Sequence, residues 1–207
     1  MLSPPALTWL ALATLAASTS AQPPGDAEAD TAAYYQRLRH FRAVKDSLLG
    51  EEGSPIPERE RGSFAGLSYF PPEAGFLVEG DLHLYGRSRR ILSATNTDSL
   101  LPVVRYGRFV SEFSGERFWL EIYLTEATDE LAVFFTDPTN GESTYGGGRY
   151  VPVHCGEGGR CVIDFNESYN PYCAYDERAY ICPMPPPQNS LPFAVTAGER
   201  AYTGPPP

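Results

Sequence analysis

Side chains that could carry chemistry are concentrated in one C-terminal block, from Asp137 to Asn189. Asp, Asn, Tyr and Arg residues alternate there without the spacing of an amphipathic helix or strand. Because buried polar groups need hydrogen-bond partners, such a segment predicts either a dense structural network or a binding site for a small molecule. The residues that we expect to bind this ligand are Tyr145, Arg149, Asp164, Asn166, Asn170 and Tyr175.

Carboxylates in the block suggest a second chemistry. Asp137 and Asp164 could serve a hydrolase as an acid–base pair, which needs two carboxyl groups at a set separation. With Asn166 and Glu167 they also offer oxygen ligands suited to Ca²⁺, but the spacing is not that of a calcium loop, and we predict no metal site. The alternative role of the two aspartates is structural, as caps of turns.

Other catalytic classes lack their sequence signatures. The chain has no Gly-x-Ser-x-Gly nucleophile elbow, and its three histidines are far apart in sequence. The glycines at 146–148 precede a predicted strand and no Gly-Lys-Ser/Thr follows, so they do not form a phosphate loop. We expect them to let the backbone pass close to a bulky residue such as Tyr169 or Tyr172. Arg149 would then lie over an aromatic ring or pair with Asp164. The sequence indicates no particular cofactor.

The N-terminus carries the pattern of an export signal. An apolar run over residues 6–17 is followed by Thr19-Ser20-Ala21, the small residues that a signal peptidase needs. We therefore predict a signal peptide over residues 1–21, a flexible linker over 22–30, and a periplasmic or secreted protein. No later stretch approaches the roughly 18 apolar residues of a membrane span, so we expect no integral membrane segment after cleavage.

The four cysteines are disulfide candidates, because an exported protein meets an oxidising compartment. Cys155 and Cys161 flank Gly-Glu-Gly-Gly-Arg, which can turn back sharply. We expect these two to pair, and Cys173 to pair with Cys182 across a short loop. The rival interpretation is a zinc site, but the Cys-x2–4-Cys spacing typical of such sites is absent.

The elements that must position the block are mostly strands. Apolar residues at three- and four-residue steps predict one helix over residues 31–49, packed on the outside of the domain. Short strand-like runs follow, separated by Gly, Pro and Asn turns. They are Phe76–Leu84, Arg90–Thr95, Val103–Phe113, Arg117–Leu124, Leu131–Thr136, Arg149–Val153, Val162–Phe165 and Phe193–Thr196. We predict one mainly β domain over residues 31–207, an antiparallel barrel or sandwich of about eight short strands with an N-terminal helix.

The charge of the chain limits its partners. The net charge is −10, and an acidic protein repels phosphate backbones, so nucleic acid is not expected as a partner. Arg87, Arg89 and Arg90 form a small basic cluster between two predicted strands. We interpret it as a solvated hairpin tip, with an anion-binding patch as the alternative. The oligomeric state stays open.

Three motifs make the chain resemble a known family. A Thr-Tyr-Gly-x-Gly-Arg-Tyr run spans Thr144–Tyr150, an Asp-Phe-Asn-x-x-Tyr-Asn-Pro-x-Cys-Ala-Tyr run spans Asp164–Tyr175, and a Cys-Pro-x-Pro-Pro-x-x-Asn run spans Cys182–Asn189. With them the chain resembles the prokaryotic family called domain of unknown function 1684, over Arg42–Tyr202. The resemblance implies a shared fold and brings no activity with it.

Overall fold

The computed structural model describes residues 24–125 and 129–204, and the predicted signal peptide lies outside them. Seven antiparallel strands form one sheet in the order β5-β4-β3-β2-β1-β7-β6. The strands are β1 (Leu77–Ala94), β2 (Leu100–Phe113), β3 (Glu116–Thr125), β4 (Glu130–Phe135), β5 (Arg149–Pro152), β6 (His154–Cys155) and β7 (Arg160–Asp164). The helices are α1 (Pro24–Gly50), α2 (Glu58–Arg61) and the short 3₁₀ turns η1 (Ala74–Phe76), η2 (Glu157–Gly159), η3 (Phe165–Glu167), η4 (Tyr172–Ala174) and η5 (Pro187–Asn189).

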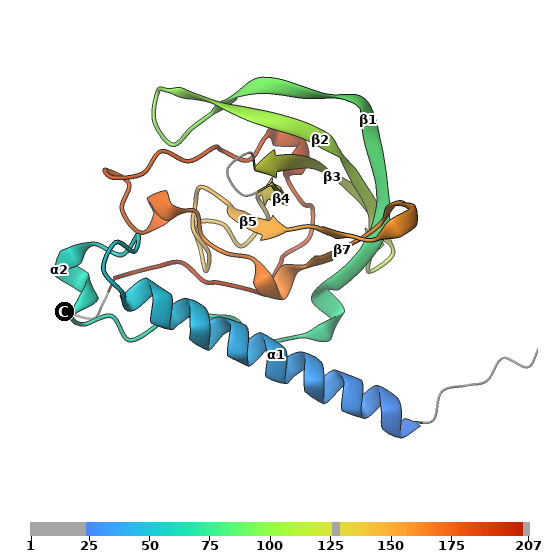
Figure 1. The fold of residues 1–207 in the computed structure, drawn as a ribbon, viewed down its shortest axis with the longest axis horizontal. Coiled ribbons are helices and arrows are strands. Elements are labelled where there is room, and N and C mark those ends of the chain that lie inside the picture. Colours follow the sequence, from blue (N-terminus) through green and yellow to red (C-terminus); the bar gives the residue numbers. More distant parts are fainter. Residues whose placement is uncertain (1–23, 126–128, 205–207) are drawn as a thin grey trace, which may run out of the picture.

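The sheet curls into a nearly closed barrel (Figure 1). Strands β5 and β6 stand at its two edges, yet only Val153 separates them in the chain. The chain therefore steps directly from one edge of the sheet to the other, which brings the edges together. The predicted mainly β fold is thus confirmed, as a barrel and not a sandwich.

Two predicted strands are in fact one. The runs Phe76–Leu84 and Arg90–Thr95 both fall in β1, whose pairing with β2 is interrupted by a bulge. The basic cluster is therefore not a hairpin tip, because the chain continues through it along the same strand. The predicted strand Phe193–Thr196 is irregular in the structure, and the short strand β6 was not expected.

The core fills the inside of the barrel. Alternate residues of the strands point inward and are fully buried, among them Phe109, Leu120, Ile122, Val133, Phe135, Val151 and Ile163. Their neighbours on the opposite face of β3, β4 and β5 are buried as well, including Tyr123, Phe134 and Tyr150. Residues of the C-terminal block cover that outer face, so the block is the second layer of the fold.

Helix α1 lies against one side of the barrel (Figure 1). It begins at Pro24, earlier than the predicted Thr31, so the expected linker is partly helical. Its buried side chains are Tyr34, Leu38 and Leu49, whereas Phe41, Val44 and Leu48 are 41%, 44% and 64% exposed. Among the described residues no helix has the length and apolarity needed to cross a membrane.

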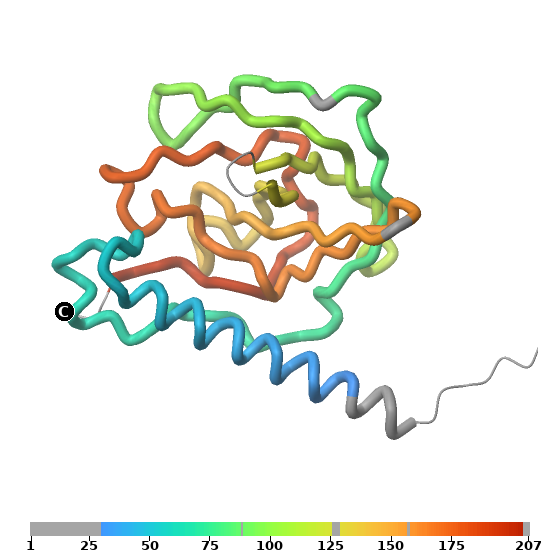
Figure 2. Tube along the Cα trace, viewed as in Figure 1, coloured from blue at the N-terminus to red at the C-terminus, as the bar shows by residue number. Residues whose placement is uncertain are grey.

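The C-terminal segment runs between α1 and the strands (Figure 2). Its Glu199 forms an ion pair with Lys45 of α1, and its Tyr202 donates a hydrogen bond to Glu60 of α2 at 3.0 Å. Val195 and Ala197 are fully buried in the core. This segment therefore links the helices to the barrel.

Candidate functional site

Arg149 is the centre of the first polar cluster, at the start of β5. Its guanidinium is fully buried and donates hydrogen bonds to the backbone carbonyls of Val195, Ala197 and Glu199. It also contacts the Asp137 carboxylate at 3.4 Å. Burial lowers the pKa of Arg149, and the Asp137 charge opposes this effect. Arg149 thus ties the C-terminal segment to the barrel.

The neighbours of Arg149 differ partly from those expected. Its guanidinium lies 5.3 Å from the centre of the Phe135 ring, as the aromatic alternative predicts, but its carboxylate partner is Asp137 and not Asp164. Gly148 has φ +91°, and a Cβ there would lie 2.5 Å from Pro185. The glycine run therefore lets the backbone pass Pro185, where Tyr169 or Tyr172 was expected.

Asp164 and Asn166 form a second cluster that holds α1. The Tyr34 hydroxyl donates to Asp164 at 2.9 Å, and Asn166 donates from its side-chain amide to both Asp164 and Tyr34. Asn166 also exchanges hydrogen bonds with the backbone of Glu73. Burial and the Asp164 partner raise the pKa of Tyr34. These contacts fix the N-terminal half of α1 to the end of β7.

A third cluster surrounds the buried carboxylate of Glu199. One oxygen accepts from the backbone N–H of Asn170 and from the Tyr175 hydroxyl, each at 2.8 Å. The other oxygen pairs with Lys45. Burial raises the pKa of Tyr175, with Glu199 adding to the effect. Asn170 and Tyr175 are therefore partners of Glu199. The sequence did not single out Glu199 as a site residue, because a lone glutamate belongs to no recognisable catalytic or binding pattern.

Asn189 is another buried polar residue that was not singled out. Its amide donates to the carbonyls of Glu121 and Phe134 and accepts from the Glu121 N–H at 2.7 Å. It bridges β3 and β4, where it replaces ladder hydrogen bonds between the strands. The only hint in the sequence is its place at the end of the Cys182–Asn189 motif.

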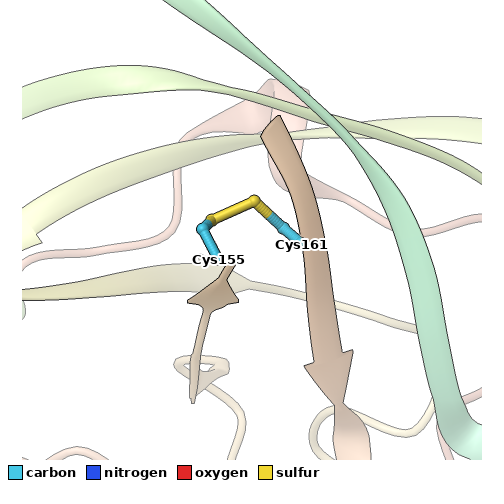
Figure 3. Close-up of a disulfide and its surroundings, with 2 residues drawn as sticks. All are labelled: Cys155 and Cys161. Carbon is cyan, nitrogen blue, oxygen red and sulfur yellow. A yellow bond between two sulfur atoms is a disulfide. The ribbon is translucent and has the colours of Figure 1, made fainter. Parts of the chain in front are cut away.

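The cysteines behave differently in their two pairs. Cys155 and Cys161 are register partners on β6 and β7 and form a disulfide across the turn (Figure 3). Gly158 and Gly159 take positive φ there, as a sharp turn requires. The bridge expected between Cys173 and Cys182 is absent, and both are buried thiols.

The two thiols nevertheless touch. The backbone N–H of Cys173 donates to Cys182 Sγ at 3.2 Å, so the short loop brings the pair together as expected, although no bridge joins the two sulfurs. A hydrogen bond between the two thiol groups lowers the pKa of Cys182 to about 7 and raises the pKa of Cys173. Tyr145 packs against this pair, and burial raises its pKa to about 12.

A groove of about 1260 Å³ lies between the C-terminal end of α1 and the barrel. Its apolar and aromatic lining comprises Phe41, Leu48, Leu49, Tyr106, Leu124, Leu131, Val153, Tyr169, Tyr172 and Tyr180. Phe41, Leu48 and Tyr172 are exposed large hydrophobic side chains. The Asp137–Asn189 block thus contributes to a cavity, but not through the six residues expected to bind.

The groove is acidic. Five carboxylates line it, from Glu51, Glu52, Asp129, Glu130 and Glu167. Its basic groups are Lys45, which is paired with Glu199, and His154, which lies 3.5 Å from Glu167. Burial raises the pKa of Glu167, and the Asp164 charge adds to this effect. The field in the groove therefore favours a cation over an anion.

The expected site residues do not meet in one place. Arg149 is the centre of the first cluster, Asp164 and Asn166 form the second, and Asn170 and Tyr175 bond to Glu199 in the third. None of the six expected binding residues lines the groove. Asp137 accepts from Thr139 and from the Val195 N–H at 2.6 Å, while Asp164 accepts from Tyr34 and Asn166. Both aspartates are thus engaged in structural hydrogen bonds, and neither faces the groove as an acid–base pair would require.

Comparison with known proteins fits the motifs. A family model described as "Protein of unknown function (DUF1684)" matches residues 62–200. The solution NMR structure of the uncharacterized protein from gene locus rrnAC0354 of Haloarcula marismortui is similar, with 32% sequence identity and a TM-score of 0.65. The alignment covers 84% of this chain and 97% of that one. No curated protein matches the chain.

Proposed function

The chain belongs to the DUF1684 family of proteins of unknown function, and on that premise we propose that it is an exported protein that binds a small apolar molecule carrying a positive charge. The observation that carries the proposal is the groove beside α1, which combines an aromatic lining with five carboxylates. Export is supported by the signal pattern of residues 1–21 and by the Cys155–Cys161 disulfide, which suits an oxidising compartment.

The chemistry of the ligand follows from the lining. Apolar pockets with a few convergent polar groups are typical of small-molecule sites. Tyr172 offers an exposed aromatic face, and aromatic faces attract cations through the ring quadrupole. Lys45 already lies 4.7 Å from the centre of the Tyr169 ring, which is the same kind of contact. An amine attached to an alkyl or aromatic body would satisfy both the apolar lining and the carboxylates.

The proposal separates the two parts of the Asp137–Asn189 block. Glu167, Tyr169, Tyr172 and Tyr180 contribute to the groove, and the buried clusters around Arg149 hold the fold that supports it. A purely structural block remains the competing interpretation, in which the groove holds only water.

A matched ligand series tests the proposal. We expect decylammonium to raise the melting temperature while decanoate, with a similar chain and opposite charge, does not. At a ligand concentration of 100 times Kd the stabilisation is about 2.7 kcal/mol, a rise of about 5–10 °C for a chain of this size. Equal effects of the two ligands would overturn the charge argument.

Two variants locate the binding. Tyr172→Ala should weaken decylammonium binding because it removes an exposed aromatic wall. Leu92→Ala is the matched control, since Leu92 is an exposed apolar residue outside the groove. Loss of binding in both variants, or in neither, would place the ligand elsewhere.

A further inference from the structure

A second hollow, of about 560 Å³, lies on strands β1 and β2 and shares no lining residue with the groove. It is lined by Tyr85, Gly86, Arg87, Arg89 and Arg105. The composition of this lining is opposite to that of the groove: it contains three arginines and no carboxylate. The chain as a whole has a net charge of −10, whereas the three arginines make the lining of this hollow positively charged.

A large bulge in β1 creates the hollow. Leu84 pairs with Gly107 and Arg89 pairs with Arg105, so residues 85–88 stand opposite Tyr106 alone. Extra residues in one strand of a pair are left without ladder partners and bend that strand. The bulge therefore pushes the segment that carries Tyr85 and Arg87 out of the regular sheet, beside Arg105.

The three arginines have different partners. Arg105 donates to the buried Glu121 carboxylate at 2.7 Å, so its charge is balanced within the protein. Arg87 and Arg89 are exposed, and within residues 24–125 and 129–204 the side chain of neither forms an ion pair or a hydrogen bond. Two guanidinium groups thus face solvent at the hollow without a counter-charge from the described protein.

The Tyr85 hydroxyl adds an oriented donor. It accepts hydrogen bonds from Arg105 at 3.3 Å and from Arg108 at 2.8 Å. The Arg105 and Arg108 guanidinium groups also lie 5.0 and 5.6 Å from the centre of the Tyr85 ring. Because the hydroxyl oxygen already accepts twice, its own proton is left to donate to a bound acceptor. Tyr85 is held in place before any ligand arrives.

We infer that this hollow is an anion site that binds the phosphate group of a small phosphorylated molecule, with Arg87, Arg89 and the Tyr85 hydroxyl as its donors. Guanidinium groups match the oxygen geometry of phosphate and bind it by paired hydrogen bonds. The volume exceeds that of a lone phosphate ion and falls in the range of small-molecule sites. A long polyanion is disfavoured, since the net charge of −10 repels it beyond this local patch.

Calorimetric titration of the full mature chain tests the inference. The probes are inorganic phosphate and phenyl phosphate, titrated at constant ionic strength set with sodium chloride, which removes general screening effects. We expect both to bind, and phenyl phosphate to bind more tightly because its ring fits the remaining volume. Tighter binding of inorganic phosphate would identify the free ion as the ligand and overturn the assignment to an organic phosphate.

Substitutions then assign the binding to the hollow. Arg87→Gln/Arg89→Gln should raise the Kd for phenyl phosphate by about tenfold or more. Arg39→Gln, an exposed arginine on α1, is the matched control and should leave the Kd unchanged. An unchanged Kd in the double variant, an equal loss in the control, or binding of heparin without binding of phenyl phosphate would each overturn the proposal.

A milder variant keeps the test decisive if the double substitution unfolds the protein. Arg89→Lys retains the charge and removes the paired donors, so phenyl phosphate binding should weaken several-fold while the circular dichroism spectrum stays that of the parent. A Kd equal to that of the parent would show that paired donation from Arg89 plays no part.

Discussion

Replacing Arg149 by methionine should cost more stability than any other single change in the block. The guanidinium is fully buried and serves four acceptors, namely the Asp137 carboxylate and the carbonyls of Val195, Ala197 and Glu199. Methionine fills a similar volume and donates nothing. The substitution therefore leaves one charge and three carbonyls in the interior without this donor.

The magnitude follows from those four acceptors. A buried acceptor left without a partner costs about 1–3 kcal/mol, and removing one partner of a buried ion pair costs about 3–5 kcal/mol. These costs overlap, and the Val195 N–H still stabilises Asp137. We expect a total loss of about 4–6 kcal/mol, a large share of the 5–15 kcal/mol of a typical domain. The melting temperature should fall by about 10–20 °C.

Urea unfolding followed by circular dichroism measures this loss, with Arg39→Met as the control. Arg39 is exposed, so its substitution should change stability by no more than about 0.5 kcal/mol. Adding Asp137→Asn to the Arg149→Met variant should recover part of the loss, because it removes the charge left without its cation. A loss below about 1 kcal/mol for Arg149→Met, or no recovery in the double variant, would refute the role of Arg149 as a clamp.

Three further predictions concern other parts of the molecule. Alkylation of the unreduced protein in denaturant, which exposes buried thiols, should label two cysteines, Cys173 and Cys182, and mass spectra with none or four labelled would contradict the cysteine assignments. Burial raises the pKa of Glu167, so the folded protein favours the neutral carboxyl group. The contribution of this group to stability is fully present below the ordinary carboxyl pKa and is lost as pH rises through the raised pKa. Glu167→Gln should therefore shift the urea midpoint upward near pH 7 and leave it unchanged in acid, and a downward shift near pH 7 would be the contrary result. Gly198→Ala should destabilise the protein by at least about 2 kcal/mol more than Gly53→Ala in the same assay. Both glycines have positive φ, but of the two only Gly198 would place a new Cβ 2.5 Å from a carbonyl oxygen. Similar losses in the two variants would contradict this.

The barrel could be predicted because its strands carry their own pattern. In β3, the alternate residues Phe118, Leu120 and Ile122 are buried in the core as the alternation indicates. The turn between Cys155 and Cys161 was likewise visible as a glycine-rich segment between two strands. These are local signals, in which the residues that decide the structure are neighbours in the chain.

The packing of α1 was only partly predictable from its apolar residues: Tyr34 and Leu38 are buried, but Phe41, Val44 and Leu48 are exposed. The face that meets the rest of the protein includes Arg42, Lys45 and Asp46, which bond to Phe70, Glu199 and Tyr69 respectively. Periodicity of apolar residues finds a helix that packs on a hydrophobic core. Besides burying Tyr34, Leu38 and Leu49, the helix packs on a polar network, and the partners of these three polar residues each lie more than 20 residues away in the chain. The exposed Phe41 and Leu48 are left to line the groove.

Neither cavity could be located from the sequence, for a related reason. The groove is assembled from α1, the 51–55 connector, the ends of several strands and the C-terminal block, so no single motif contains it. The basic hollow depends on a bulge that joins two runs into one strand. From the sequence alone, Arg87 and Arg89 are interpreted as part of a solvated hairpin tip, with an anion-binding patch only as the alternative. Spacing alone cannot show how two strands are paired, and the register decides which charges converge.

Lys45 connects the structural clusters to the groove. Its ammonium group pairs with the buried Glu199, lies over the Tyr169 ring and contributes to the lining of the groove. Glu199 in turn is held by Asn170 and Tyr175, two of the residues expected to bind a ligand. Because a buried carboxylate needs its counter-charge, Lys45 is not available to neutralise the five acidic groups of the groove. For the proposed cationic ligand, the polar block would thus act on binding at a distance. By engaging Lys45, the only lysine of the sequence, it leaves the acidic groups of the groove without that counter-charge.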